Sequence, residues 1–300
     1  MTAPTALDAA PASLTHAARD AVLGIGLLCA MDAVVKATTA RYPVVEVSFL
    51  RFAFGALWMI PVVLWARPRL PSREALRVNA IRGLLVVATV LTFFTSLARL
   101  PLAEATALAF LAPTFMAVFG VMLLGERVDR RIVGALVVGF AGMLVIVFGQ
   151  GDPTAGLDGF RLDPVGVAAG LSAAVFYALA MVLVRARARI DGIVTIVALQ
   201  NLVPAVILAV PAVFFWVPLA PADVGLFTLA GFLGASGHLL LTRAFRAAEA
   251  SRLAPLDYTS LVWATVLGFA FFGEVPGLAT FAGATLIVAG AIVASRRKRG

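Results

Sequence analysis

The chain alternates between apolar stretches, each about twenty residues long, and short connections rich in charge, proline or glycine. A helix of about twenty apolar residues crosses the hydrocarbon core of a bilayer, and it satisfies its backbone N–H and C=O groups within its own span. The pattern therefore predicts an all-α integral membrane protein with ten transmembrane helices. The expected spans are Ala21–Thr39, Val44–Ala66, Ala80–Ala98, Leu102–Leu124, Ile132–Phe148, Pro164–Val184, Ile193–Trp216, Val224–Ala244, Leu253–Phe272 and Pro276–Ala294.

Composition indicates the same class. Hydrophobic residues make up 62% of the chain and charged residues 13%, whereas a soluble domain carries about 25% charged residues. The net charge of +8 comes mainly from short loops, so we expect no nucleic-acid partner, which would need a folded basic patch. One cysteine and two histidines predict no disulfide, no metal site and no cofactor. The expected partners are the lipid bilayer and a small-molecule substrate, bound by a monomer or homodimer.

The connections predict the domain organisation. Residues 1–20 have Arg19 as their only cation, which indicates a mobile tail rather than a cleaved signal peptide. A Gly-, Pro- and Asp-containing linker, 149–163, separates two halves, 21–148 and 164–294, and residues 295–300 form a basic tail. Most Lys and Arg residues fall on the side of the N-terminus, and such cations are retained in the cytoplasm. We therefore expect a bacterial inner-membrane protein with cytoplasmic N- and C-termini and a periplasmic linker.

The two halves repeat each other. Gly125-Glu126 recurs as Gly273-Glu274, and Ala141-Gly142 recurs as Ala289-Gly290 at the same spacing. The triplet at 103–105, Ala-Glu-Ala, returns at 248–250. Each half holds five predicted spans, and because five is odd the second half enters the membrane from the opposite side. This predicts two inverted five-helix repeats, the arrangement of many secondary transporters.

These motifs resemble a known family. The run LPLAEATALAFLAPTFMAVFGVMLLGERVDRR with GFAGMLVIV after it, and its second copy AEASRLAPLDYTSLVWATVLGFAFFGE with VAGAIVAS, are similar to EamA-type members of the drug/metabolite transporter superfamily. The resemblance implies transport of amino acids, including aromatic ones, or of riboflavin, S-adenosylmethionine, drugs and other metabolites. The segments MDAVVK and FLRF look most like the bacterial metabolite-carrier and amino-acid-exporter branches.

Ionisable residues inside membrane spans are costly and are functional candidates. At about 1.5 Å per residue, Asp32 lies roughly 17 Å from the inner end of the first span and Arg51 roughly 12 Å from the outer end of the second. The two residues therefore share a depth, and Lys36 and Glu46 share a shallower one. One interpretation is that both pairs are structural ion pairs joining the first two spans. The alternative is that Asp32 and Arg51, or Lys36, face a cavity and bind the charged groups of a zwitterion.

Further polar residues are candidates for binding or coupling. Thr92 and Ser96 share one helical face with Thr89 and Arg99, which predicts either helix packing or cavity lining. Burial near lipid would suit Asp257 for proton coupling, unless it pairs with Arg252 or Arg246. The other candidates are Tyr177 and His238 near the midplane, and Gln200, Asn201 and Tyr258 nearer the cytoplasmic third.

Two prolines and one tryptophan complete the candidates. Pro113 and Pro255 interrupt the fourth and ninth spans and would permit bends, so they are hinge candidates. Trp263 lies deep enough to stack on a flat substrate, although core packing is the alternative. Trp65 and Trp216 sit at span ends, where tryptophan anchors the membrane interface.

The sequence predicts a secondary active transporter that exports amino acids or related metabolites by alternating access. No Walker motif is present to bind ATP. No cluster of Asp, His or metal ligands occurs in a loop to indicate an integral-membrane enzyme. The alternative cargo is riboflavin, S-adenosylmethionine or a similar cofactor-like metabolite, taken up rather than exported.

Overall fold

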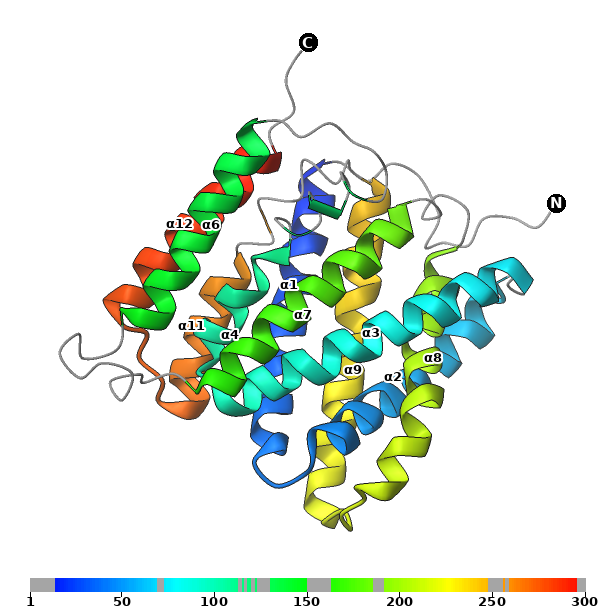
Figure 1. The fold of residues 1–300 in the computed structure, drawn as a ribbon. Coiled ribbons are helices and arrows are strands. Elements are labelled where there is room, and N and C mark those ends of the chain that lie inside the picture. Colours follow the sequence, from blue (N-terminus) through cyan, green and yellow to red (C-terminus); the bar gives the residue numbers. More distant parts are fainter. Residues whose placement is uncertain are drawn as a thin grey trace. The chain divides into compact units, whose positions relative to one another are not determined.

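The computed structural model describes residues 14–68, 73–112, 115, 118–119, 122, 130–149, 163–185, 192–247, 256 and 259–295 (Figure 1). Within these ranges the regular elements are helices and no strand occurs, so the all-α prediction is confirmed. The helices are α1 (Leu14–Thr39), α2 (Val44–Ala66), α3 (Arg73–Arg99), α4 (Leu102–Ala109), α6 (Arg130–Phe148), α7 (Pro164–Arg185), α8 (Ile193–Phe214), α9 (Pro221–Ala247), α11 (Thr259–Phe272) and α12 (Leu278–Ser295).

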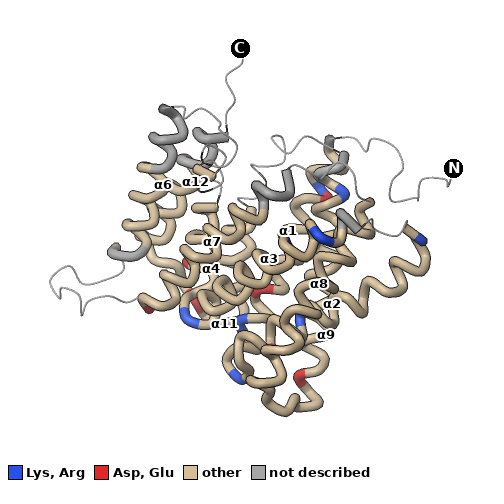
Figure 2. The backbone as a smooth tube through the Cα atoms, turned by 45° about the vertical axis from the view of Figure 1, so that its right-hand side comes forward, with Lys and Arg blue, Asp and Glu red and all other residues tan. Residues whose placement is uncertain are grey.

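Among the described residues, five helices are long and apolar enough to cross a membrane, namely α1, α2, α3, α8 and α9. Shorter apolar segments occupy α6, α7, α11 and α12. Figure 2 shows that charged residues are few along the described helices. The structure thus fits a multi-pass membrane protein, while the ten-span count and the inverted repeat stay predictions.

Two helices begin about two turns earlier than the sequence predicts. The first starts at Leu14 rather than Ala21, because Ala17 and Ala21 pack against Ala244 of α9. Buried Asp20 contributes there through ion pairs with Arg19 and Arg243. The third helix starts at Arg73 rather than Ala80.

The chain forms two compact units. The first comprises residues 1–87 and 187–263, in which α1 packs against α9, and α2 packs against α8 and α9. The second comprises residues 88–186 and 264–300, in which α6 packs along α12 and α4 contacts α7 (Figure 1).

Glycines bring α6 and α12 together. A Cβ added at Gly142 would lie 2.6 Å from the carbonyl oxygen of Gly283 and 2.8 Å from Cγ1 of Ile287. The contact is therefore between backbones, as in membrane helix pairs built on small residues. Gly134 lies on the same helix and is exposed, with nothing within 4 Å of an added Cβ.

Gly142→Ala is expected to destabilise the second unit by about 1–3 kcal/mol, because α6 must move away from the α12 backbone. Gly134→Ala is the matched control, and it should leave stability unchanged or raise it slightly through its helix propensity. Thermal unfolding of both variants in detergent measures the difference. Equal unfolding temperatures would show that the helices do not meet through Gly142.

Asp163 caps the start of α7 and lies just outside that helix. Its Oδ1 accepts the N–H groups of Val165 and Gly166 at 2.7 and 3.0 Å, and its Oδ2 accepts a hydrogen bond from Arg99 at 2.8 Å. The hydrogen bonds from Gly166 and then from Arg99 hold the pKa of Asp163 below its ordinary value. Asx capping of this kind is a common start for a helix.

The lowered pKa predicts a pH dependence. A carboxylate whose pKa is lower in the folded state stabilises the fold above its unfolded pKa of about 3.9 and loses that effect as pH falls through the folded value. Asp163→Ala should therefore lower the unfolding temperature at pH 7, and the difference from wild type should shrink as pH falls through the folded pKa, where the neutral acid keeps only the cap. Asp163→Asn should keep the cap and lose only the charge interaction. Thermal unfolding against pH tests this, and a difference independent of pH would contradict it.

Candidate functional site

Arg51 of α2 is a buried cation of the first unit, with 2% of its surface exposed. Its Nε donates to the sulfur of Met31 at 3.1 Å, and its Cζ lies 4.1 Å from the centre of the Phe52 ring. Its Nη1 is buried and has no hydrogen-bond partner among the described residues. The guanidinium group therefore has hydrogen-bonding capacity that the surrounding protein leaves unused.

A glycine of α9 makes room for this guanidinium. A Cβ at Gly234 would lie 2.8 Å from Nη2 of Arg51 and 2.9 Å from the sulfur of Met31. One helical turn away on α2, Gly55 meets Asn201 of α8 and the backbone of Gly231. Small residues thus let α2 sit close to α9 and place the charged group in the interior.

Asp32 of α1 interacts electrostatically with Arg51. Both residues belong to the first unit. An acidic and a basic group thus lie near one another in the apolar interior of this helix group. The two roles predicted for the pair, a staple between helices and a site for a zwitterion, both stay open predictions.

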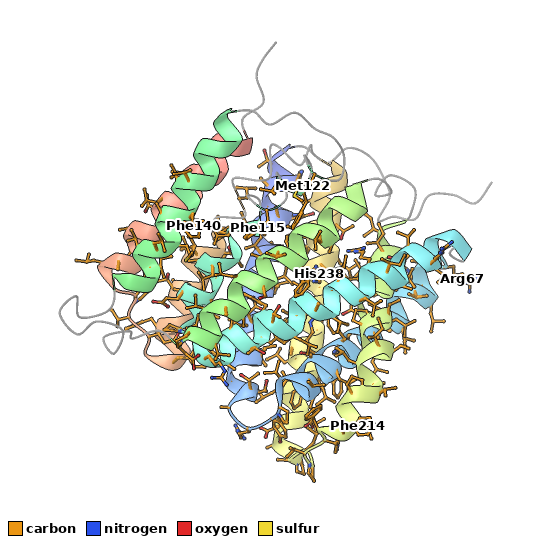
Figure 3. All side chains as sticks on the ribbon, viewed as in Figure 1. Arg67, Phe115, Met122, Phe140, Phe214 and His238 are labelled. Atoms are coloured by element: carbon orange, nitrogen blue, oxygen red, sulfur yellow. The ribbon has the colours of Figure 1, made fainter. Side chains whose placement is uncertain are left out.

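A chain of polar contacts joins His238, Gln200 and Arg82. His238 of α9, labelled in Figure 3, interacts electrostatically with Arg51 and with Arg82. The amide nitrogen of Gln200 lies 3.3 Å from each ring nitrogen of His238. The amide oxygen of Gln200 accepts a hydrogen bond from Arg82 at 3.1 Å. A small pocket beside this chain is lined by Asn79, Arg82, Gly83, Val86, Leu199, Gln200 and Pro204.

The structure thus brings four predicted candidates, Asp32, Arg51, Gln200 and His238, into one polar group within the first unit. Arg82 was missed from the sequence, because it lies only two residues inside the predicted third span. A cation so close to a span end is more often a solvated anchor, and only its contact with Gln200 indicates otherwise.

Glu46 is fully buried in the first turn of α2. Its Oε2 accepts the backbone N–H of Val217 at 2.9 Å, and its Oε1 is buried without a hydrogen-bond partner among the described residues. Lys36 is half-buried near the end of α1. The predicted pairing of Lys36 with Glu46 stays a prediction, since the contact that the structure shows for this carboxylate is to the backbone.

Asn201 contributes to packing. It is fully buried, and its Nδ2 donates to the carbonyl oxygen of Val197 at 2.8 Å. Its Oδ1 lies against Gly55, where only a glycine leaves room for it. This close approach of a polar oxygen to a glycine backbone is a recurring contact between membrane helices.

Trp263 and three candidates of the second unit lie in other surroundings. The indole of Trp263 packs over Gly26 of α1, 3.0 Å from where a Cβ would stand. Ser96 is fully buried against Gly170 of α7. The hydroxyl of Thr92 donates to carbonyl oxygens of its own helix at 2.7 and 3.0 Å, while 44% of Tyr177 is exposed. For Ser96 and Trp263 these contacts favour packing. The candidates Pro113, Pro255, Asp257 and Tyr258 lie outside the described residues.

One copy of each repeated Glu motif, Glu104 and Glu274, lies in the described part of the second unit. Oε2 of Glu274 accepts the N–H of Leu102 at 2.8 Å and so caps α4, whose own N-cap residue is Pro101. Oε1 of Glu104 accepts a hydrogen bond from the hydroxyl of Thr280 at 2.9 Å. These contacts fasten α4 to α12 and to the loop before it. They border a pocket lined by Pro101, Ala103, Glu104, Ala264, Thr265, Gly268, Glu274, Val275 and Pro276.

Comparisons with known proteins agree with the membrane architecture. The model of the EamA-like transporter family matches the chain twice, over residues 22–148 and 164–296. The chain is 33% identical to the pseudopaline exporter CntI of Pseudomonas aeruginosa over 93% of its own length and 96% of that protein. It is 24% identical to an S-adenosylmethionine uptake transporter of Rickettsia bellii, covering 86% of each chain.

Two further matches have similar coverage. A riboflavin transporter of Rhizobium johnstonii is 28% identical over 86% of this chain and 82% of that protein. A protein of known crystal structure is 25% identical with a TM-score of 0.61, covering 92% of this chain and 96% of that one. The predicted resemblance is thus confirmed, and the chain, a multi-pass membrane transporter rather than an enzyme, belongs to the EamA-like transporter family.

Proposed function

We propose that this transporter is a secondary active exporter of amino acids, aromatic ones included, or of related small metabolites. Its place of action is the bacterial inner membrane, with both termini in the cytoplasm. It works by alternating access, in which one binding site opens to each side of the membrane in turn. The double match to the family model supports two repeats, and a relative named an exporter supports the direction.

The observation that carries this proposal is the buried guanidinium of Arg51. A cation inside a membrane span is costly and marks a functional candidate, and this one keeps a nitrogen without an acceptor among the residues that the structure describes. A substrate carboxylate would supply that acceptor, because guanidinium and carboxylate groups form charge-assisted hydrogen bonds. Most small metabolites that resemble amino acids carry such a group.

Asp32 provides the complementary charge. Because it interacts with Arg51, a zwitterion would meet an acidic and a basic group in the same part of the first unit. The carboxylate of the substrate would bind Arg51, and the ammonium group of the substrate would bind Asp32. The contact between Gln200 and His238 adds uncharged polar groups that would hydrogen-bond the rest of such a substrate. The pair thus favours zwitterionic metabolites over purely apolar compounds.

The second candidate function is uptake of riboflavin, S-adenosylmethionine or a similar cofactor-like metabolite. It is favoured by two relatives, named an S-adenosylmethionine uptake transporter and a riboflavin transporter. Their identities of 24% and 28% are lower than the 33% shared with the exporter. Rescue of a riboflavin-requiring or S-adenosylmethionine-requiring strain by the gene would favour uptake.

The deciding experiment is flux in proteoliposomes. The purified full chain is reconstituted, a pH gradient is imposed, and a panel of labelled amino acids, riboflavin and S-adenosylmethionine is followed in both directions. Accumulation of an amino acid driven by the gradient supports the proposal. Movement of the cofactor-like compounds alone supports uptake, and no movement of any compound contradicts the proposed cargo.

A further inference from the structure

Two buried carboxylates at one end of the first unit differ in their hydrogen-bond and charge partners. Asp223 of α9 is 3% exposed, and it accepts hydrogen bonds from Arg41 at 3.0 Å and from the Tyr42 hydroxyl at 2.8 Å. Glu46, four residues after Tyr42, is fully buried, and among the described residues it receives a single hydrogen bond, from the backbone of Val217. Asp223 is therefore compensated by a cation and a phenol, and Glu46 by one amide.

A buried ionised carboxylate needs compensation. Removing such a charge from water is costly unless a counter-charge and several hydrogen bonds replace the lost hydration. The net contribution of one amide hydrogen bond falls short of that cost. Oε1 also has no hydrogen-bond partner among the described residues. In this arrangement, the neutral acid is the form that the surroundings of Glu46 accommodate.

We propose that Glu46 is the residue that binds the coupling proton of the transport cycle. The inference rests on the secondary transport proposed above, and it names the ion and the group that takes it. The proton comes from water when this end of the unit is open and adds to the carboxylate. It leaves to water on the opposite side of the membrane when the transporter opens there, and no bond of the substrate forms or breaks.

The geometry gives the direction of the coupling. The N–H that contacts Glu46 belongs to the connection between α8 and α9, so the carboxylate joins α2 to that connection. The aromatic contact of Phe49 with Trp216, at 6.3 Å between ring centres, closes the same connection over α2. The charged form of Glu46 favours an open, hydrated end, and the neutral form favours the closed one. Proton binding therefore shifts the population toward closure.

Other ionisable groups near Glu46 lie on α1, on α2 and in the connection between them. Arg41 and Tyr42 of the connection between α1 and α2 both contact Asp223 of α9. Lys36 lies on α1, within the last turn of that helix. On its own helix, Glu46 is followed by Arg51, more than one turn away.

Trp216 provides a probe of this end that needs no substrate. The purified full chain in lipid nanodiscs is titrated while its tryptophan emission is followed, and Trp216→Phe identifies the part that comes from Trp216. We expect a pH-dependent change in that part for wild type and for Glu46→Asp, which keeps a carboxylate. Glu46→Gln should lose the change, and Asp223→Asn should retain it.

A second measurement uses the wild-type protein, so the proposal can be tested even if Glu46→Gln fails to fold. Acidification of the wild-type protein should produce an infrared band of a newly protonated carboxyl group at the pH of the emission change. In proteoliposomes, Glu46→Gln should also lose the dependence of flux on the pH gradient while it still exchanges substrate across the membrane.

The proposal is overturned if Glu46→Gln titrates as wild type does, or if wild type shows neither the emission change nor the carboxyl band between pH 4 and 9. If the titration is present and none of the labelled compounds moves, the proposed cargo fails and the proton site stands. If the compounds move and Glu46→Gln keeps the full effect of the gradient, the proton site fails and the transport proposal stands.

Discussion

Arg51→Gln is expected to reduce transport by about tenfold to a hundredfold, because hydrogen bonds to a charged group contribute about 1.5–3 kcal/mol each. The substitution keeps a polar but shorter side chain in the space beside Gly234. It removes the positive charge and the nitrogen that we assign to the substrate carboxylate. Arg51→Lys keeps the charge but loses the planar fork, so it should retain part of the flux.

Arg67→Gln is the matched control for this prediction. Arg67 ends the same helix, is exposed, and undergoes the same chemical change. Initial rates of amino-acid flux in proteoliposomes, corrected for the amount of protein inserted, provide the measurement. Wild-type flux in Arg51→Gln would show that the guanidinium has no contact with substrate.

Charge exchange between Asp32 of α1 and Arg51 of α2 can distinguish a structural ion pair from a substrate-binding pair. If Asp32 and Arg51 serve only to join α1 and α2, reversing one charge should lower protein yield, and exchanging the two residues should restore both yield and flux. If they bind a zwitterion, the exchanged protein should recover yield while its flux stays low, because the binding groups are transposed relative to the substrate. The two interpretations thus differ in the flux of one double variant.

Helix ends were predictable where residues next to the helix in the sequence determine them. The second helix runs from Val44 to Ala66, as the sequence predicts, because Pro43 precedes it and Arg67 adopts a left-handed conformation directly before Pro68. The first helix begins earlier than predicted, since its Ala-rich start is stabilised by contact with α9. That contact depends on a residue more than two hundred positions away, which no local pattern reveals.

The candidate site was partly predictable for a related reason. Charge inside an apolar span is visible in a sequence, so Asp32, Arg51 and His238 could be identified and their depths compared. Their partners come from other helices. The contact of Glu46 with Val217, the seat of Asn201 against Gly55, and the cap that Glu274 gives to α4 each require two segments to meet in space. A repeated motif drew attention to Glu274 but gave no indication of what it binds.

Three glycines of α9 should respond differently to alanine, and the differences follow from what each would touch. A Cβ at Gly231 would lie 2.6 Å from backbone atoms of Gly55 and Phe54, which cannot move without displacing α2. At Gly234 the nearest atoms are the ends of the Arg51 and Met31 side chains, which can rotate away. At Gly225 nothing lies within 4 Å.

Gly231→Ala is therefore expected to destabilise the protein by about 1–3 kcal/mol or more, with reduced yield in membranes. Gly234→Ala should fold with little loss of stability but displace the guanidinium of Arg51, and a misplaced contact worth about 1.4 kcal/mol lowers flux about tenfold. Gly225→Ala should match wild type in both respects, because alanine favours the helix and meets no neighbour. Unfolding temperature in detergent and flux in proteoliposomes, measured side by side, separate the three cases. Wild-type flux in Gly234→Ala would show that transport does not depend on the placement of Arg51 against α9.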